Sequence, residues 1–128
     1  MNRKKDKSQL TEVELELMRV LWNLGESSVN SIILEIGKTR KMAYTSAATI
    51  LGILEDKQFL TSRKEGKTRL YTPLVKKEEY ESRTINKMVK TFFDDKPVAM
   101  VARLVEVETV SHEELQARKK LLEDRLKN

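Results

Sequence analysis

Residues 42–74 read MAYTSAATILGILEDKQFLTSRKEGKTRLYTPL, and this segment carries the clearest pattern of secondary structure in the chain. Residues 42–60 have the spacing of a helix with one buried face. The apolar residues that recur at i, i+3, i+4 and i+7 are Ala47, Ile50, Leu51 and Leu54. Residues 59–63 and 67–72 then read as two short strands joined by a turn at Glu65–Gly66, with a proline ending the second strand. The stretch therefore predicts a helix followed at once by a basic β-hairpin.

Two shorter helices precede this stretch. A capping box, Thr11-x-x-Glu14, opens the first, and Gly25 ends it. Ser27 or Ser28 caps the second, with Gly37 expected as its left-handed C-terminal residue. The residues expected on the buried faces of the two helices are Val13, Leu17, Val20, Leu21, Leu24, Val29, Ile32, Ile33 and Ile36. Three short helices followed by a hairpin are the elements of a winged helix–turn–helix domain.

The C-terminal part reads as three amphipathic helices. The first spans residues 77–93, the second begins at Pro97 after an Asp94–Asp95 pair expected to cap it, and a capping box at Ser111-x-x-Glu114 opens the third. These helices have apolar faces but no further partner in the chain, so we expect a homodimer. The residues expected at the dimer interface are Met88, Phe92, Val101, Leu104, Val105, Leu115 and Leu122.

The predicted fold class is therefore mainly α with a small β-hairpin. We expect a flexible basic arm over residues 1–8, a winged-helix DNA-binding domain over 9–75 and a helical dimerisation domain over 76–128.

Charge and composition narrow the function. The net charge is +5, and residues 38–69 alone hold eight Lys or Arg against three Asp or Glu. This local excess indicates a polyanionic partner such as double-stranded DNA. The chain has no cysteine and one histidine, which excludes thiolate metal sites and sites with two imidazoles. With no catalytic constellation, no signal peptide and no long apolar run, we expect a cytoplasmic protein that is not an enzyme, uses no metal or cofactor and does not insert into membranes.

The outward face of the predicted third helix carries small side chains. On a helical wheel of residues 41–56, the positions opposite the core are Lys41, Thr45, Ala48, Thr49, Gly52 and Asp56. Solvated helices usually carry long charged side chains instead, so another surface is expected to come close. DNA is one such surface. Packing against a protein helix, or simple exposure to water, is the alternative, and the basic hairpin could equally be a solvated face.

The order of helix, turn and basic hairpin favours DNA over a protein helix or water as the partner of this face. The residues expected to contact it are Lys41, Tyr44, Thr45, Ser46, Thr49, Arg63, Lys64, Lys67 and Arg69. The threonines and Ala48 would meet base edges and thymine methyl groups in the major groove. The basic residues of the hairpin would meet phosphates.

Several segments together resemble a known family. They are LTEVELELMRVLW (10–22), AYTSAATIL (43–51) with LEDK (54–57), YTPL (71–74), FFDDKPVAMVARL (92–104) and SHEEL (111–115). Their order and spacing are similar to those of the penicillinase-repressor group of bacterial transcription regulators, also called the BlaI/MecI/CopY family. The resemblance covers about Leu10 to Leu126.

The resemblance implies a dimeric winged-helix repressor that binds a two-fold symmetric, inverted-repeat operator. It implies that the third helix enters the major groove, with contacts from Tyr44, Thr45, Ser46 and Thr49. One branch of the family is cleaved at an Asn–Phe bond when a membrane sensor is triggered, but here the equivalent positions are Arg103–Leu104. The copper-responsive branch uses cysteines, which this chain lacks. The sequence identifies no inducing protease or sensor.

Two positions depart from the family pattern. In this chain Gln58 replaces the glycine that usually follows the third helix. Gly52 or Ile53 replaces the arginine that is common near the end of that helix.

The leading hypothesis is a sequence-specific, homodimeric DNA-binding repressor. The alternative is a winged-helix protein-interaction adaptor that has lost specific DNA binding.

Overall fold

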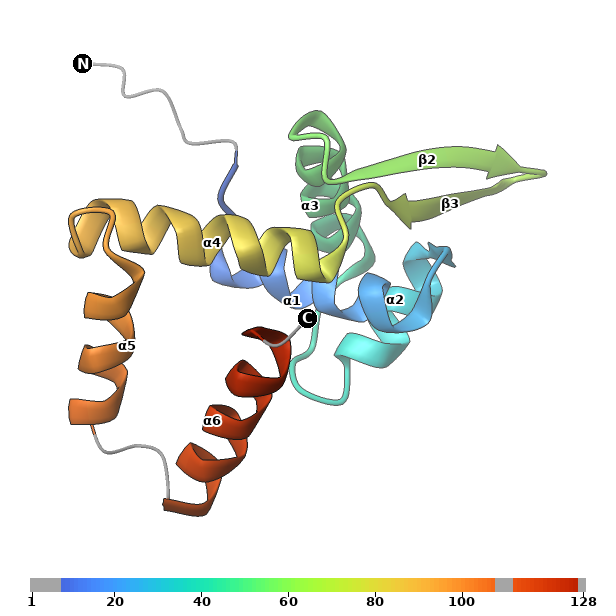
Figure 1. Cartoon of the computed structure of the whole chain (residues 1–128). Coiled ribbons are helices and arrows are strands. Elements are labelled where there is room, and N and C mark those ends of the chain that lie inside the picture. The colour runs from blue at the N-terminus through green and yellow to red at the C-terminus, as the bar shows by residue number, and fades with distance from the viewer. Residues whose placement is uncertain (1–7, 108–111, 127–128) are drawn as a thin grey trace. The chain divides into compact units, whose positions relative to one another are not determined.

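The computed structural model describes residues 8–107 and 112–126 (Figure 1). The expected arm at residues 1–8 lies outside them, except for Ser8. Contacts divide the chain into two units, residues 1–84 and 85–128. The elements in chain order are α1 (Glu12–Leu24), β1 (Ser27–Ser28), α2 (Val29–Ile36), α3 (Tyr44–Asp56), β2 (Leu60–Glu65), β3 (Thr68–Pro73), α4 (Lys77–Phe92), α5 (Pro97–Glu106) and α6 (His112–Leu126).

The first two helices begin and end where the sequence predicts. The backbone N–H of Thr11 donates to Glu14 Oε1 at 2.8 Å, and the N–H of Glu14 donates to Thr11 Oγ1 at 3.2 Å, which confirms the capping box. Gly25 ends α1 with a φ of +79°. Ser28 rather than Ser27 caps α2, since its Oγ accepts from the N–H of Ser31 at 3.2 Å.

One hydrophobic core lies between α1, α2, α3 and the sheet. Its buried residues are Leu17, Met18, Leu21, Val29, Ile32, Ile36, Ala47, Leu51, Leu54, Phe59, Leu60, Tyr71 and Val75. The expectation that Leu24 is buried is wrong: it is 44% exposed at the last position of α1. The first turn of α4 packs on the same unit, because the Tyr80 ring lies 5.6 Å from that of Phe59 and 6.1 Å from that of Trp22.

The β-structure is a three-stranded antiparallel sheet of order β1-β3-β2. The two-residue strand β1 pairs with β3 and was not expected from the sequence, because two serines carry no strand signal. The hairpin turn is Gly66–Lys67, one residue later than predicted, since Glu65 pairs with Thr68. A positive φ of 64° at Gly66, its first central residue, is the conformation of a type II′ turn. The predicted winged-helix fold is confirmed.

The conformation of the residue that ends α2 and the bounds of α3 differ from the prediction. Gly37 is right-handed, with a φ of −59°, because the chain winds on and the N–H groups of Thr39 and Arg40 both donate to the Ile36 carbonyl. The third helix begins at Tyr44 and ends at Asp56, so it is shorter than the predicted 42–60. Gln58 adopts the left-handed conformation, with a φ of 66°, although it is not glycine.

The C-terminal unit contains the end of α4 together with α5 and α6. The expectation that Asp94 and Asp95 cap α5 is wrong. Both have a positive φ, and the Asp95 N–H donates to the Val89 carbonyl, so they end α4 instead. Lys96 is the N-cap of α5 and Pro97 is its first residue, as predicted. The expected cap Ser111 lies outside the described residues. In the described ranges, no helix is both long and apolar enough to cross a membrane.

Candidate nucleic-acid interface

Helix α3 buries one face and exposes the other. Ala47, Leu51 and Leu54 are fully buried in the core. The opposite face carries exposed Thr45, Ser46 and Thr49, which with Ile50 line one shallow, open depression. Tyr44 at the start of the helix is 54% exposed. Lys41 is exposed too, but it lies in the loop before α3 and not on the helical wheel used to place it.

The outward face of α3 carries small side chains, so another molecule can approach the helix closely. Thr49 Oγ1 donates to the Thr45 carbonyl at 2.9 Å, so this hydroxyl is satisfied inside the helix. A Cβ built on Gly52 would meet no atom within 4 Å. The N-cap, Ala43, makes no side-chain capping hydrogen bond, and the first turn contains no acidic residue. The positive end of the helix dipole is therefore not neutralised by a side chain of its own N-cap or first turn, which suits a phosphate.

The hairpin β2–β3, the wing, has two faces, and one of them is joined to α3. Ser62 Oγ donates to Glu55 Oε2 of α3 at 2.7 Å, and Arg69 Nη1 donates to Ser62 Oγ at 3.0 Å. Side chains alternate along a strand, so Lys64 lies on the same face as Ser62. Lys64 also pairs directly with Arg69 across the hairpin. We define Lys64 and Arg69 as the α3 face of the wing.

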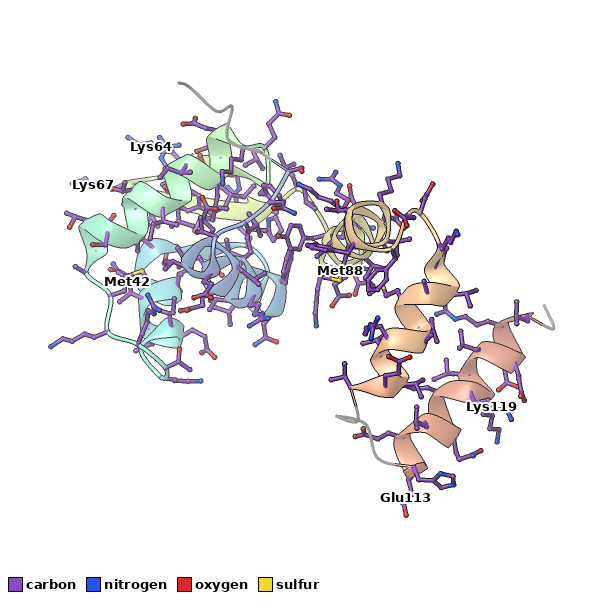
Figure 2. The ribbon with its side chains drawn as sticks, turned by 90° about the vertical axis from the view of Figure 1, so that its left-hand side faces the viewer. Met42, Lys64, Lys67, Met88, Glu113 and Lys119 are labelled. Atoms are coloured by element: carbon purple, nitrogen blue, oxygen red, sulfur yellow. The ribbon has the colours of Figure 1, made fainter. Side chains whose placement is uncertain are left out.

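Two lysines of the wing stay unpaired. In the part of the chain that the structure describes, no ion pair or side-chain hydrogen bond engages Lys64 or Lys67, which Figure 2 labels. Lys67 lies in the turn at the tip of the hairpin. Both cations are therefore free to bind an anion.

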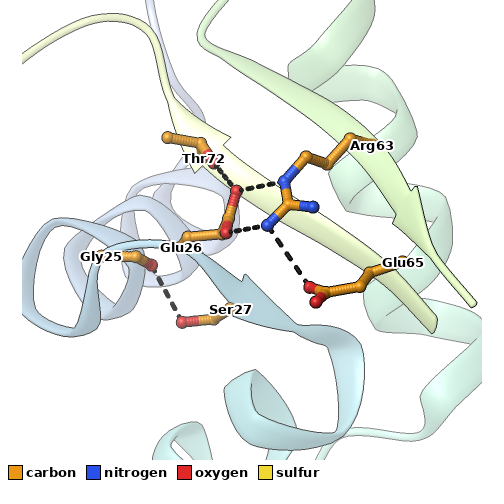
Figure 3. A network of polar contacts seen from close by, with 6 residues as sticks. All are labelled: Gly25, Glu26, Ser27, Arg63, Glu65 and Thr72. Carbon is orange, nitrogen blue, oxygen red and sulfur yellow. Dashed lines mark hydrogen bonds and ion pairs between the residues drawn. The ribbon is translucent and has the colours of Figure 1, made fainter.

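Arg63 lies on the other face of the wing. Its Nε donates to Glu26 Oε2 at 3.0 Å and its Nη2 to Glu26 Oε1 at 2.7 Å (Figure 3). Thr72 Oγ1 donates to the same carboxylate at 2.9 Å, and Glu65 lies 3.3 Å from Nη2. The hydrogen bonds from Arg63 first, and then that from Thr72, lower the pKa of Glu26. The hydrogen bond with Glu26 in turn raises the pKa of Arg63.

The structure thus separates the predicted site residues. Thr45, Ser46 and Thr49 line one exposed depression on α3, whereas Tyr44 lies at the start of the helix. Lys64 and Arg69 share the side of the hairpin that contacts α3, and Arg63 lies on the opposite side. Strand alternation alone could have separated Arg63 from Lys64. No sequence signal joins Glu26 to Arg63, since 37 residues separate them. The sequence likewise gives no sign that Ser62 and Glu55 connect the wing to α3.

The residues expected at the dimer interface leave an apolar surface exposed in the C-terminal unit. A groove of about 590 Å³ is lined by Val101, Leu104, Val105, Leu115, Arg118, Lys119, Leu121, Leu122 and Arg125. On α4, Phe92 is 74% exposed and Met88 is 39% exposed.

The chain is similar to known repressors over almost its whole length. A family model described as penicillinase repressor matches residues 10–124. A penicillinase repressor from Bacillus licheniformis is 28% identical over 116 residues, which are 91% of this chain and 91% of that protein. The methicillin resistance regulatory protein MecI from Staphylococcus aureus strain N315 is 27% identical over 118 residues, 89% of this chain and 93% of that one. The solution structure of the DNA binding domain of the repressor BlaI, at 32% identity and a TM-score of 0.52, covers 60% of this chain and 94% of that one.

Proposed function

The chain belongs to the penicillinase repressor family, and we propose that it represses transcription as a homodimer bound to an inverted-repeat operator. It is a DNA-binding transcriptional repressor and not an enzyme. Repression would follow from occupancy, because a dimer seated on promoter DNA blocks access to it. Promoter DNA of a bacterium lies in the cytoplasm, so we infer that the protein acts there.

One observation supports the mode of binding: the face of the wing that carries Arg69 is hydrogen-bonded to α3 through Ser62 and Glu55. The chain of hydrogen bonds Arg69–Ser62–Glu55 fixes the hairpin against the helix. A duplex that receives α3 in its major groove would bring its backbone to Lys64 and Arg69. Lys67 at the tip would reach a further phosphate.

The two parts of this surface have different tasks. Thr45, Ser46 and Thr49 are short, so they read bases only where the helix comes close. Tyr44 and Lys41 lie at and just before the start of α3, where they would contact backbone phosphates of a duplex that receives the helix. Sequence preference would therefore come from α3, and sequence-independent affinity from the cations around it.

Dimerisation would use the apolar faces of the C-terminal unit. Val101, Leu104 and Val105 of α5 are each about half exposed in the single chain, at 51%, 46% and 49%. Leu115 and Leu122 of α6 line the same groove. A second copy would bury these side chains and place two recognition helices on a two-fold symmetric site.

The experiment is a titration of the full chain on DNA from upstream of its own gene. A fragment with a dyad would be compared with a random duplex of equal length at about 150 mM salt, where non-specific binding is weak. We expect the dyad fragment to bind at least a thousandfold more tightly, the lower range for specific complexes. Equal affinities for the two would contradict specific repression.

A further inference from the structure

Glu26 contacts both strands of the wing from outside it. It lies in the turn between α1 and β1, yet its carboxylate accepts two hydrogen bonds from Arg63 on β2 and one from Thr72 on β3 (Figure 3). The two bonds from Arg63 form the bidentate geometry in which a guanidinium and a carboxylate bind most strongly. Among the described residues, Arg63 is the only cationic side chain on this face of the wing, and it is already paired with the Glu26 carboxylate.

Charge makes the two faces of the wing unlike. Glu26, Glu65 and Arg63 lie together, so two carboxylates and one guanidinium give this cluster a formal charge of −1. On the α3 face, Lys64 and Arg69 have no carboxylate within ion-pair distance among the described residues. Together with Glu55, which accepts a hydrogen bond from Ser62, they give that face a formal charge of +1. A phosphate is attracted to the second face and meets a net negative charge on the first.

We propose that Glu26 withholds Arg63 from DNA and so confines phosphate binding by the wing to Lys64, Lys67 and Arg69. The proposal rests on the DNA-binding function proposed above and assigns Glu26 a role in it. Glu26 is a positioning residue that acts through Arg63. Phosphate binding by Arg63 would require the displacement of a bidentate carboxylate.

Lys64 and Arg63 offer a matched comparison, because they are neighbours on opposite faces of one strand. The probe is a short random-sequence duplex, since phosphate contacts do not depend on sequence. The affinity of the full chain is measured from about 50 to about 200 mM salt. The logarithm of the affinity falls as the logarithm of the salt concentration rises. Lys64→Gln should make this negative slope less steep by about 0.9, the value for one phosphate contact. Arg63→Gln should change it by less than half as much.

Two further variants test Glu26 itself. Glu26→Gln keeps an acceptor for Thr72 but removes the charge that holds Arg63, so it should bind the duplex more tightly than the unaltered chain. The double variant Glu26→Gln/Arg63→Gln removes the pair without changing net charge, so its slope should equal that of the unaltered chain. Thermal unfolding of each variant checks that it remains folded.

Either of two results would overturn the proposal: equal slopes for Arg63→Gln and Lys64→Gln, or no gain in affinity for Glu26→Gln. Failure of the unaltered chain to bind any duplex at low salt would instead contradict the proposed function.

Discussion

The Lys57 ammonium, directly after α3, lies 2.8 Å from the Glu14 carboxylate in the first turn of α1. Both side chains are nearly buried, with 13% and 7% of their surface exposed. Lys57 Nζ also donates to the Gln9 carbonyl at 3.2 Å. This pair joins the end of α3 to the start of α1, and Glu14 belongs to the capping box as well.

Substitution of Lys57 should therefore destabilise the winged-helix unit. Lys57→Met leaves a buried carboxylate without its cation, and we expect a loss of about 3 kcal/mol in the free energy of unfolding. Lys38→Met, which removes the exposed pair with Glu35, is the control and should change it by less than about 1 kcal/mol. Urea unfolding measures both. Equal, small effects would show that the buried pair contributes no more than the exposed one.

The same carboxylate should make stability depend on pH. Burial, the largest single effect, raises the pKa of Glu14, but the hydrogen bonds and charge of Lys57 and the hydrogen bonds of Thr11 together outweigh it and lower the pKa below 4.5. Its contribution to stability is then complete above pH 4.5 and is lost as the pH falls through the folded-state pKa. Thermal unfolding should show a decline below that pH that is smaller in Glu14→Gln. An identical decline in both proteins would contradict this assignment.

Gln58 should be replaceable with a gain in stability. It ends α3 in a Schellman arrangement, since its N–H donates to the Glu55 carbonyl and the Phe59 N–H donates to the Leu54 carbonyl. A side chain in the left-handed region costs about 1 kcal/mol. Gln58→Gly should therefore raise the free energy of unfolding by roughly 0.5–1 kcal/mol, and Gln58→Ala should not. A glycine variant that is less stable than the unaltered chain would disprove the strain.

Gly52 tests whether the outward face of α3 must stay small. Nothing lies within 4 Å of a Cβ at this position, so Gly52→Ala should stabilise the helix by about 1 kcal/mol. Gly52→Leu should keep that gain but reduce operator affinity at least tenfold, because its side chain occupies the space that DNA needs. Fluorescence titration of both variants on the dyad fragment measures the difference. A leucine variant that binds as tightly as the alanine variant would exclude close approach at this turn.

A charge in the C-terminal groove should break the proposed dimer. Leu104→Glu introduces a carboxylate into the apolar lining, so analytical ultracentrifugation should find a monomer. Operator affinity should fall as well, because each half-site would bind separately. Glu123→Gln, at a position outside the groove lining, is the control. An unchanged sedimentation coefficient for Leu104→Glu would place the interface elsewhere.

Local signals allowed most of the fold to be predicted. Thr11 with Glu14, Gly25, Ser28 and Pro97 each mark a helix boundary through a contact with their own neighbours in the chain. The features that the sequence did not predict depend instead on contacts with other parts of the fold. Strand β1 exists only because β3 pairs with it, and Gln58 is left-handed because the packing of Phe59 against the core outweighs local strain.

The site was predicted less completely for the same reason. The residue types of α3 and the wing were visible in sequence, since their pattern repeats over a few residues. The pairing of Glu26 with Arg63 depends on the sheet, which brings the turn after α1 against the hairpin. Charge counting treats Arg63 and Lys64 as equal, whereas the structure gives them different partners.

In the proposed mode of binding, α3 reads the DNA sequence while the surrounding cations supply affinity. The most direct measurement is the ratio of affinities for the dyad fragment and for the same fragment with scrambled half-sites. It is determined for the unaltered chain, for Thr45→Ala/Thr49→Ala and for Arg69→Ala. We predict that the double threonine variant loses most of this ratio while keeping its affinity for the scrambled fragment. Arg69→Ala should weaken binding to both fragments and keep the ratio. A ratio that survives the loss of both threonines would show that α3 does not read the sequence through them.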